Sequence, residues 1–239
     1  MKHVHIILQG KGGVGKSFVS SLTTQYLHET GKPVVAVDTD PVNATLAGYK
    51  AFDTQRLELM ESGALVERNF DKLIERIVTE DSNFVVDNGA ASFIPLSYYI
   101  AENDAINLIT GMGKEVIIHT VITGGQALMD TIAGFDQLAR QMPENAKIVV
   151  WLNEFFGEIK ADEKTFEEMK AYLNNKDRVH GIVRIAKQTG STFGQDIQMM
   201  LDTKMTFAEV AQSPDFGLMA KARLAQVKNA IFSQMANVI

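Results

Sequence analysis

Short runs of β-branched and other apolar residues alternate along the chain with longer segments whose apolar positions recur at helical spacing. The apolar runs predict strands at residues 3–8, 33–38, 83–87, 115–122, 147–153 and 178–185. The segments between and after them predict helices at residues 16–29, 65–78, 95–112, 126–142, 162–174 and 215–238. Strands that alternate with helices are typical of a mainly parallel, buried sheet. We therefore expect an α/β fold, a doubly wound sheet with helices on both faces.

The predicted elements leave no obvious linker, internal repeat or low-complexity tract, so we expect residues 1–239 to form one domain. The longest unbroken apolar run covers residues 148–152, far short of the roughly 18 residues of a membrane-spanning helix. The N-terminal residues lack the apolar stretch and cleavage site of a secretion signal. We therefore expect no stable membrane insertion and a cytoplasmic location. The polar stretch at residues 188–195 predicts a surface loop.

The composition removes several kinds of chemistry. The chain has no cysteine, which excludes disulfides, thiolate-held iron–sulfur clusters and cysteine nucleophiles. Its 23 Lys and Arg against 29 Asp and Glu give a net charge of −6, which argues against a surface that is basic throughout and covered by nucleic acid. Residues 176–187 form the most basic window. Direct DNA contact and ordinary exposed charge explain this window equally well.

The strand at residues 3–8 is followed by Gly-Lys-Gly-Gly-Val-Gly-Lys-Ser at residues 10–17, which matches G-x-x-x-x-G-K-[S/T] at every fixed position. This P-loop signature stands in its expected place, after a strand and before a helix. Glycines are needed because backbone N–H groups must turn inward around phosphate oxygens. Lys16 then reaches the β- and γ-phosphates, and the Ser17 hydroxyl is a ligand of Mg²⁺. The candidate nucleotide-binding residues here are Gly10, Gly12, Gly13, Val14, Gly15, Lys16, Ser17 and Phe18.

Carboxylates lie at the ends of two further predicted strands. Asp38 and Asp40 follow the second strand, and Asp87 ends the third. In open α/β sheets, ligands bind at the carboxyl ends of the strands. Acidic groups beside a triphosphate repel it unless a cation lies between them, so these residues make chemical sense with Mg²⁺ present. Alternatively, Asp-x-Asp-Pro at residues 38–41 begins a turn and caps a helix.

Lys11, near the start of the loop, is either an ordinary solvated residue or a more specific signal. The sequence Lys-Gly-Gly-Val-Gly-Lys-Ser at residues 11–17 resembles the deviant P-loop of the MinD/ParA class of ATPases. The resemblance implies that two copies close face to face over ATP and that Lys11 contacts the nucleotide of the opposite copy, as an arginine finger does. It also implies that Asp40 orients the attacking water and that Asp38 and Asp87 serve Mg²⁺. The candidate catalytic residues are Lys11, Lys16 and Asp40, and the candidate metal ligands are Ser17, Asp38 and Asp87.

The same resemblance assigns two further residues. In the MinD/ParA class an Asn that ends a strand often pairs with the edge of adenine, which implies this role for Asn153. An Asn at a strand end is also a common turn residue. After Asp87 the chain departs from the class, since Asn-Gly-Ala-Ala-Ser stands where a proline and a glycine are usual. Gly89 can still offer its backbone N–H to the γ-phosphate.

Several longer segments resemble the TraL proteins of broad-host-range conjugative plasmids. These segments are residues 8–17, 38–45, 87–90, 119–128 and 149–153. They include the stretches after Asp40 and Asp87, which the general MinD/ParA pattern does not explain. The resemblance implies a role in plasmid DNA transfer between bacteria, in which the protein organises or positions the transfer complex and contacts a protein partner there.

The expected function is thus a Mg²⁺-ATP-dependent, dimerising ATPase that hydrolyses ATP slowly in conjugative DNA transfer. One alternative is a nucleotide-gated binding module or scaffold with negligible hydrolysis, and another is a plasmid partition ATPase. Iron–sulfur reductases of the same fold are excluded because the chain has no cysteine. Tyrosine kinases of this lineage carry a tyrosine-rich tail, which residues 233–239 do not form. A metabolic ligase stays open, although Lys11 is unexpected there.

The last predicted helix has an apolar face. Its members are Leu224, Val227, Ile231, Met235 and Val238. This spacing is explained by packing onto the core or by attachment to a membrane surface. The polar face of the helix is only modestly basic, which favours packing. We also expect Trp151, within a predicted strand, to lie in the core.

Overall fold

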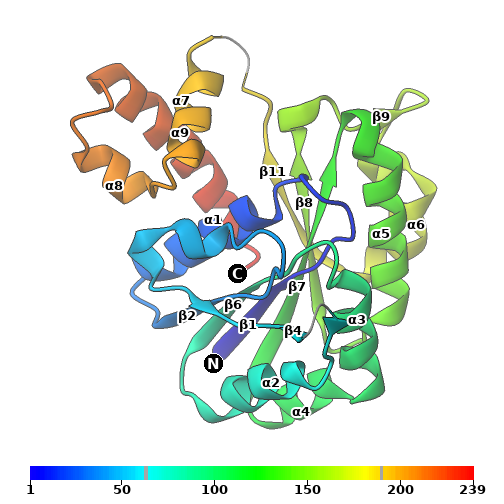
Figure 1. The fold of residues 1–239 in the computed structure, drawn as a ribbon. Helices are drawn as coiled ribbons and strands as arrows, with labels where there is room; N and C mark the ends of the chain where they lie inside the picture. Colours follow the sequence, from blue (N-terminus) through cyan, green and yellow to red (C-terminus); the bar gives the residue numbers. More distant parts are fainter. Residues whose placement is uncertain (62–63, 189–190) are drawn as a thin grey trace.

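The computed structural model describes residues 1–61, 64–188 and 191–239. A seven-stranded sheet runs through its centre in the order β11-β8-β7-β1-β6-β2-β3, and every neighbouring pair is parallel (Figure 1). The strands are β1 (Lys2–Ile7), β2 (Val34–Asp38), β3 (Gln55–Arg56), β6 (Asn83–Asp87), β7 (Lys114–Thr123), β8 (Lys147–Asn153) and β11 (Val179–Ile185). Two small antiparallel hairpins pair β4 (Met60–Glu61) with β5 (Ala64–Leu65) and β9 (Lys160–Ala161) with β10 (Lys164–Thr165). The six expected strands are confirmed, and the sheet gains the short edge strand β3.

Helices cover both faces of the sheet, as the sequence predicts (Figure 1). They are α1 (Lys16–Glu29), α2 (Asn69–Thr79), α3 (Phe93–Glu102), α4 (Ala105–Gly111), α5 (Leu128–Gln141), α6 (Lys170–Asn175), α7 (Phe193–Asp202), α8 (Phe207–Gln212) and α9 (Leu218–Met235). Val4 and Ile6 of β1 enter a core with α2 to α6, whereas Ile7 enters a second core with α1 and α7 to α9. Successive side chains from Val4 to Ile7, including the polar His5, are buried because both faces of the strand are covered.

Three predicted helices differ from the structure. The helix expected at residues 95–112 is two helices, α3 and α4, because Asp104 adopts a left-handed backbone conformation (φ 52°) between them. The prediction of a helix at residues 162–174 is wrong over its first half, where β10 pairs with the preceding β9 in a hairpin. The helix expected at residues 65–78 begins later, as α2. Asp and Asn tolerate left-handed conformations, so they end helices at places that apolar spacing does not reveal.

The C-terminal part contains two helices, α7 and α8, that were not predicted from the sequence. Helix α7 begins inside the stretch at residues 188–195 expected to be a loop; residues 189–190 of that stretch lie outside the described residues. The apolar positions expected on the last helix are all buried, namely Leu224, Val227, Ile231, Met235 and Val238. The packing interpretation of these positions is therefore confirmed. No helix in the described part of the chain is long and apolar enough to cross a bilayer.

The carboxyl ends of the central strands meet at one edge of the sheet. Asp38 at the end of β2 is the register partner of Asp87 at the end of β6, and Asp87 in turn faces Ile7, the last residue of β1. Asn153 ends β8, two strands from β1 on the other side. Trp151 of the same strand is fully buried, as expected. The fold therefore brings the segments that carry the sequence motifs to one place.

Candidate nucleotide-binding site

The P-loop, residues 8–15, joins β1 to α1. Gly13 and Gly15 adopt positive φ angles of 73° and 101°, a region that favours glycine. Gly15 is also the N-cap residue of α1, and no side chain of the described residues caps the helix there. The first N–H groups of α1 are thus available to an anion, which the helix dipole also favours. The loop has the backbone that a phosphate cradle requires.

Lys16, the first residue of α1, is almost buried, with 8% of its surface exposed. Its Nζ donates a hydrogen bond to the backbone carbonyl of Lys11 at 2.8 Å, so the side chain folds back along the loop. Burial lowers the pKa of Lys16, while the charges of Asp87 and Asp40 oppose that change. An ammonium group has three donors, and those beyond the loop bond suit phosphate oxygens.

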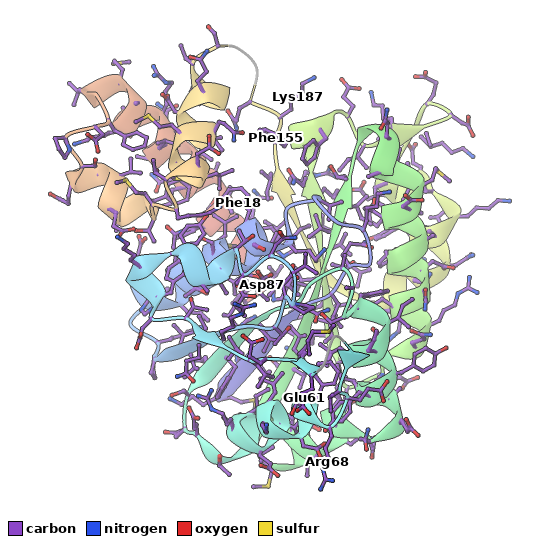
Figure 2. All side chains as sticks on the ribbon, viewed as in Figure 1. Phe18, Glu61, Arg68, Asp87, Phe155 and Lys187 are labelled. Carbon is purple, nitrogen blue, oxygen red and sulfur yellow. The ribbon has the colours of Figure 1, made fainter. Side chains whose placement is uncertain are left out.

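Asp87 lies at the centre of the molecule (Figure 2). Its Oδ1 accepts a hydrogen bond from the Ser20 hydroxyl at 2.8 Å, whereas its buried Oδ2 has no hydrogen-bond partner among the described residues. Burial raises the pKa of Asp87 to about 7, and repulsion from Asp38 adds to the rise. The hydroxyls of Ser17 and Ser20 and the charge of Lys16 oppose it. An orphaned carboxylate oxygen near hydroxyl groups fits Mg²⁺, which prefers oxygen ligands.

Asp38, at the end of β2, is also fully buried, but both of its oxygens have partners. Oδ1 accepts a hydrogen bond from the backbone N–H of Asp40, and Oδ2 accepts one from the N–H of Ala47, each at 3.0 Å. Burial raises the pKa of Asp38, and these backbone hydrogen bonds oppose the rise. Asp38 therefore ties the loop that follows β2 back to the sheet.

Asp40 begins a turn, as the alternative interpretation of Asp-x-Asp-Pro predicts. Its Oδ1 accepts hydrogen bonds from the backbone N–H groups of Val42 and Asn43, at 2.9 and 3.1 Å. The carboxylate lies directly against Gly89, where a Cβ atom would stand 2.6 Å from Asp40 Cγ. Only glycine leaves room for it. The segment that departs from the usual MinD/ParA pattern thus contacts the carboxylate that is expected to orient water.

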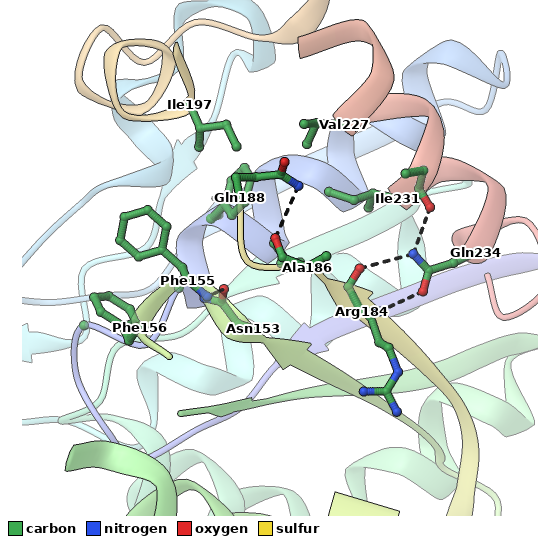
Figure 3. A pocket seen from close by; sticks show the side chains of 15 residues that line it. Asn153, Phe155, Phe156, Arg184, Ala186, Gln188, Ile197, Val227, Ile231 and Gln234 are labelled. Atoms are coloured by element: carbon green, nitrogen blue, oxygen red, sulfur yellow. Dashed lines mark hydrogen bonds between the residues drawn. The ribbon is translucent and has the colours of Figure 1, made fainter. Parts of the chain in front are cut away.

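Two cavities meet at the P-loop, and both are lined by Gly13, Gly15 and Phe18. The first has a volume of about 570 Å³ and is also lined by Gly12, Lys16, Ser17, Asp40, Asn43 and Thr45. The second has a volume of about 310 Å³ and is mainly apolar, with walls formed by Phe155, Ile185, Ile197, Val227 and Ile231 (Figure 3). The first cavity holds the charged groups that phosphates need, and the second offers the apolar surface that a base needs.

Asn153 lies at the wall of the apolar cavity next to the P-loop (Figure 3). It is buried, and its Nδ2 donates a hydrogen bond to the carbonyl of Val14 at 2.9 Å. Its Oδ1 accepts one from the N–H of Phe155 at 3.2 Å. A Cβ atom at Gly15 would stand 2.7 Å from the Asn153 amide nitrogen. Asn153 therefore contacts the P-loop, and its bond to Phe155 fits the turn role that the sequence left open.

Lys11 lies on the exposed side of the P-loop and forms an ion pair with Asp130 of α5, with 2.6 Å between Nζ and Oδ2. Asp130 was not predicted from the sequence, and it lies 119 residues from Lys11 along the chain. Both side chains are about half exposed. Exposed pairs contribute at most about 1 kcal/mol, so Lys11 can leave Asp130 at little cost.

Two other residues of the site were not predicted from the sequence. Ser20 donates to Asp87 from α1, and it stands three positions after Ser17, a spacing that places both hydroxyls on one helix face. This spacing could have indicated Ser20. Gln9 is buried at the start of the P-loop, where no motif assigns a role to its amide.

The basic window at residues 176–187 has fewer free cations than its sequence indicates. Arg178 donates hydrogen bonds to three backbone carbonyls at the end of α5 and just after it. Arg184 forms ion pairs with two glutamates, one of them Glu154 at 4.0 Å. Both arginines therefore make contacts within the chain. This arrangement favours ordinary structural charge over DNA contact.

Comparisons with known proteins agree with this geometry. Residues 5–203 match the family model described as the CobQ/CobB/MinD/ParA nucleotide binding domain. A protein named TraL from Escherichia coli is 45% identical over 235 residues, which cover 98% of this chain and 98% of that protein. The chain belongs to the TraL proteins of the MinD/ParA family. The two resemblances expected from the sequence are thus confirmed.

Two solved structures share the MinD/ParA fold with this chain. One is a putative plasmid partition protein from Borrelia burgdorferi B31 bound to AMPPNP, with 14% identity, a TM-score of 0.56 and coverage of 100% of both chains. The other is the septum site-determining protein MinD from Pyrococcus horikoshii OT3 complexed with Mg-ADP, with 20% identity, a TM-score of 0.52 and coverage of 96% and 95% of the two chains. At these identities the similarity establishes the fold alone, and it confirms the expected fold class.

Proposed function

We propose that the chain binds Mg²⁺-ATP at the P-loop, closes as a homodimer over two nucleotides and hydrolyses ATP slowly in conjugative DNA transfer. The observation that carries the proposal is a nearly buried Lys16 that lines the first cavity and lies close enough to Asp87 for their charges to interact. Asp87 is buried, and its Oδ2 has no partner among the described residues. A cation and an unsatisfied carboxylate near each other are what a triphosphate and Mg²⁺ require together.

The binding step uses the P-loop and the two strand ends behind it. Backbone N–H groups of residues 12–17 hold the β-phosphate, and Lys16 leaves the Lys11 carbonyl to reach the β- and γ-phosphates. Ser17 and Asp87 hold Mg²⁺, with Asp38 near it. When bound, Mg²⁺ neutralises charge on the phosphate oxygens. The base occupies the apolar cavity next to Phe18, as its size and lining favour.

The hydrolytic step uses Asp40, which lines the first cavity, and Lys11. Asp40 lies against Gly89, so the segments after β2 and β6 together supply an acceptor for the attacking water and a neighbouring N–H for the γ-phosphate. Lys11 leaves Asp130 and completes the pocket of the second copy. A cation supplied in this way acts on charge that develops in the transition state, by analogy with an arginine finger.

The role in conjugation rests on the TraL resemblance and not on the geometry of the site. We propose that the ATP-bound dimer engages a protein of the DNA-transfer complex and that residues 1–239 act as one domain, because α7 and α9 supply a wall of the base cavity. We also propose that the protein acts in the cytoplasm, as an ATP-dependent role implies. Plasmid transfer frequency with a Lys16→Ala chain should fall to that of a deletion, and a normal frequency would reject the ATP-dependent role.

A nucleotide-gated binding module is the second candidate. It is favoured by the turn at Asp40, because two backbone N–H groups already donate to Oδ1 and leave fewer of the carboxylate's lone pairs to accept a hydrogen bond from the attacking water. In this case ATP closes the dimer and is scarcely hydrolysed. The two candidates share every binding residue and differ only at the chemical step.

A single-turnover assay with Mg²⁺-ATP separates them. We expect the ATP affinity of Asp40→Ala to stay within a few-fold of wild type. Its rate of hydrolysis should fall by at least about 100-fold. Asp40→Asn keeps an oxygen for the turn, so it controls for loss of the loop. Equal, negligible rates in wild type and both variants would favour the module. Sedimentation with and without ATP tests closure, and a Lys11→Ala chain that still dimerises normally would contradict the role across the interface.

A further inference from the structure

The larger cavity at the P-loop has a wall that no sequence motif marks. Leu201, near the end of α7, and Lys204, in the turn after it, line this cavity together with Lys16 and Ser17. Figure 1 shows α7, α8 and α9 gathered beside α1, with which they share a core. The described lining residues of the cavity thus include two cations, Lys16 and Lys204, and one acid, Asp40.

The backbone of Lys204 has a conformation that usually belongs to glycine. Lys204 follows Thr203, the C-cap residue of α7, and its φ angle is 53°. Its N–H donates to the carbonyl of Leu201 at 3.2 Å, and the N–H of Met205 donates to the carbonyl of Met200 at 3.1 Å, which forms a Schellman motif. A residue with a Cβ atom is strained in this conformation. Backbone geometry therefore does not explain a lysine at this position.

The side chain of Lys204 runs from the turn toward the segment that follows Asp40. A Cβ atom at Gly48 would stand 3.4 Å from Lys204 Cγ and 3.8 Å from Cε, so the stem lies along the backbone there. The Nζ atom lies 6.0 Å from the centre of the Tyr49 ring. No acid in the described part of the chain forms an ion pair with Lys204. A cation–π contact at this distance is weak, so the ammonium group is available to an anion.

The charge of a nucleotide calls for such a cation. A triphosphate carries more negative charge than one Mg²⁺ ion and Lys16 offset together, and Asp40 adds a further negative charge at the same cavity. We propose that Lys204 is a further nucleotide-binding residue, whose ammonium group leaves the Tyr49 ring and donates to phosphate oxygens. This inference rests on the proposed nucleotide binding. It adds a residue that neither the P-loop motif nor the family resemblance assigns.

The proposal gives the C-terminal helices a second task at the site. Ile197 of α7 and Val227 of α9 line the apolar cavity, which is proposed to hold the base. Lys204, between α7 and α8, would hold the phosphates of the same nucleotide. The C-terminal part of the chain therefore contacts both ends of the ligand.

Titration calorimetry with Mg²⁺-ATP tests the role of Lys204. Lys204→Met keeps the stem along Gly48 and the same backbone strain, and it removes only the ammonium group. We expect its affinity for Mg²⁺-ATP to fall on the order of tenfold, as for a lost hydrogen bond to a charged group. Lys50→Met is the matched control, because Lys50 follows Tyr49 and is exposed but does not line the cavity. Its affinity should stay within about twofold of wild type.

A second variant keeps the test valid if Lys204→Met fails to fold. Lys204→Gly relieves the strain of the left-handed backbone, so the thermal midpoint of the ligand-free chain should equal or exceed that of wild type. Its Mg²⁺-ATP affinity should nevertheless fall by about the same factor as that of Lys204→Met. A residue that only supports the turn would give the opposite result, with unchanged affinity in the glycine variant.

Two results would overturn the inference alone, both in a wild-type chain that binds Mg²⁺-ATP. The first is equal affinity in Lys204→Met and Lys50→Met. The second is wild-type affinity in Lys204→Gly. Wild type that does not bind Mg²⁺-ATP at all would contradict the proposed function as well.

Discussion

The ends of β2 and β6 carry the same residue type in neighbouring positions of one sheet, yet the two carboxylates differ. Asp38 is bonded by two backbone N–H groups of its own loop. Asp87 Oδ1 accepts a hydrogen bond from the Ser20 hydroxyl of α1, and Oδ2 has no partner among the described residues. Burial raises the pKa of both, to about 7 for Asp87. Asp38 therefore holds the loop after β2 in place, whereas Asp87 has an oxygen available to bind a cation.

The difference shows that the position of a carboxylate in the fold does not fix its task. The hydrogen bonds to a buried acid offset the cost of its burial, whereas a buried acid with an unsatisfied oxygen destabilises the folded chain until a ligand arrives. Asp87 therefore makes the ligand-free chain less stable. Binding of Mg²⁺-ATP removes this destabilisation, which contributes to the affinity for the ligand. Four predictions, made with three substitutions, test this contrast.

The largest expected effect is on the pH dependence of stability. The pKa of Asp87 rises from 3.8 to about 7 on folding, which corresponds to on the order of 4 kcal/mol. Because the folded chain holds the proton more tightly, this stability is present below about pH 4 and is lost as pH rises to about 7. Urea unfolding of wild type and Asp87→Asn across this range, without Mg²⁺ or nucleotide, isolates the effect. Parallel pH profiles of the two chains would contradict it.

The same substitution should act in the opposite direction on ligand binding. Asp87→Asn removes the charge that Mg²⁺ needs, so Mg²⁺-ATP affinity should fall about 100-fold or more. ATP affinity measured in EDTA should not fall, because the substitution also removes a carboxylate that repels the triphosphate when no cation is present. Calorimetry with and without Mg²⁺ checks both values. An unchanged Mg²⁺-ATP affinity would show that Asp87 does not serve the cation.

A methyl group at the segment after β6 should disturb turnover without abolishing binding. Gly89→Ala places a Cβ atom 2.6 Å from Asp40 Cγ, so the carboxylate must move. A displacement of a catalytic group by about 1 Å lowers the rate up to about 100-fold. Gly111→Ala is the matched control, because a Cβ atom there meets nothing within 4 Å among the described residues. Equal single-turnover rates for the two variants would reject the role of the close contact.

The smallest effect is expected at Asp38. Asp38→Asn keeps one oxygen and turns an amide nitrogen toward a backbone N–H, so stability should fall by about 1–3 kcal/mol. The folded variant should still bind Mg²⁺-ATP within about tenfold of wild type. Thermal unfolding and calorimetry measure the two quantities. A larger loss of Mg²⁺ affinity than at Asp87 would reverse the proposed assignment of the two carboxylates.

Sequence predicted those parts of the molecule that depend on local pattern. The P-loop and the six main strands follow from spacing and from β-branched runs. The contrast between Asp38 and Asp87 does not, because it depends on Ser20, which is 67 residues from Asp87 along the chain. The bond from Asn153 to Val14 likewise joins positions 139 residues apart. Such partners are set by the fold, and no single motif records them.

Helices were predicted well only where they were long. The helices α7 and α8 have 10 and 6 residues, and little amphipathic pattern accumulates over such lengths. A capping box between Thr206 and Glu209 marks the start of α8 and could have revealed it. The break between α3 and α4 depends on the left-handed Asp104, a conformation that apolar spacing does not report.

The central claim is that the cavity lined by Lys16 and Ser17 binds ATP together with Mg²⁺, which the nearby Asp87 helps to hold. Calorimetric titration of ATP into the wild-type chain, with Mg²⁺ and then with EDTA, tests it most directly. We predict saturable binding that is much tighter with Mg²⁺ and that Lys16→Ala abolishes. The absence of binding heat in wild type, or the same Mg²⁺-dependent binding in Lys16→Ala, would contradict the claim.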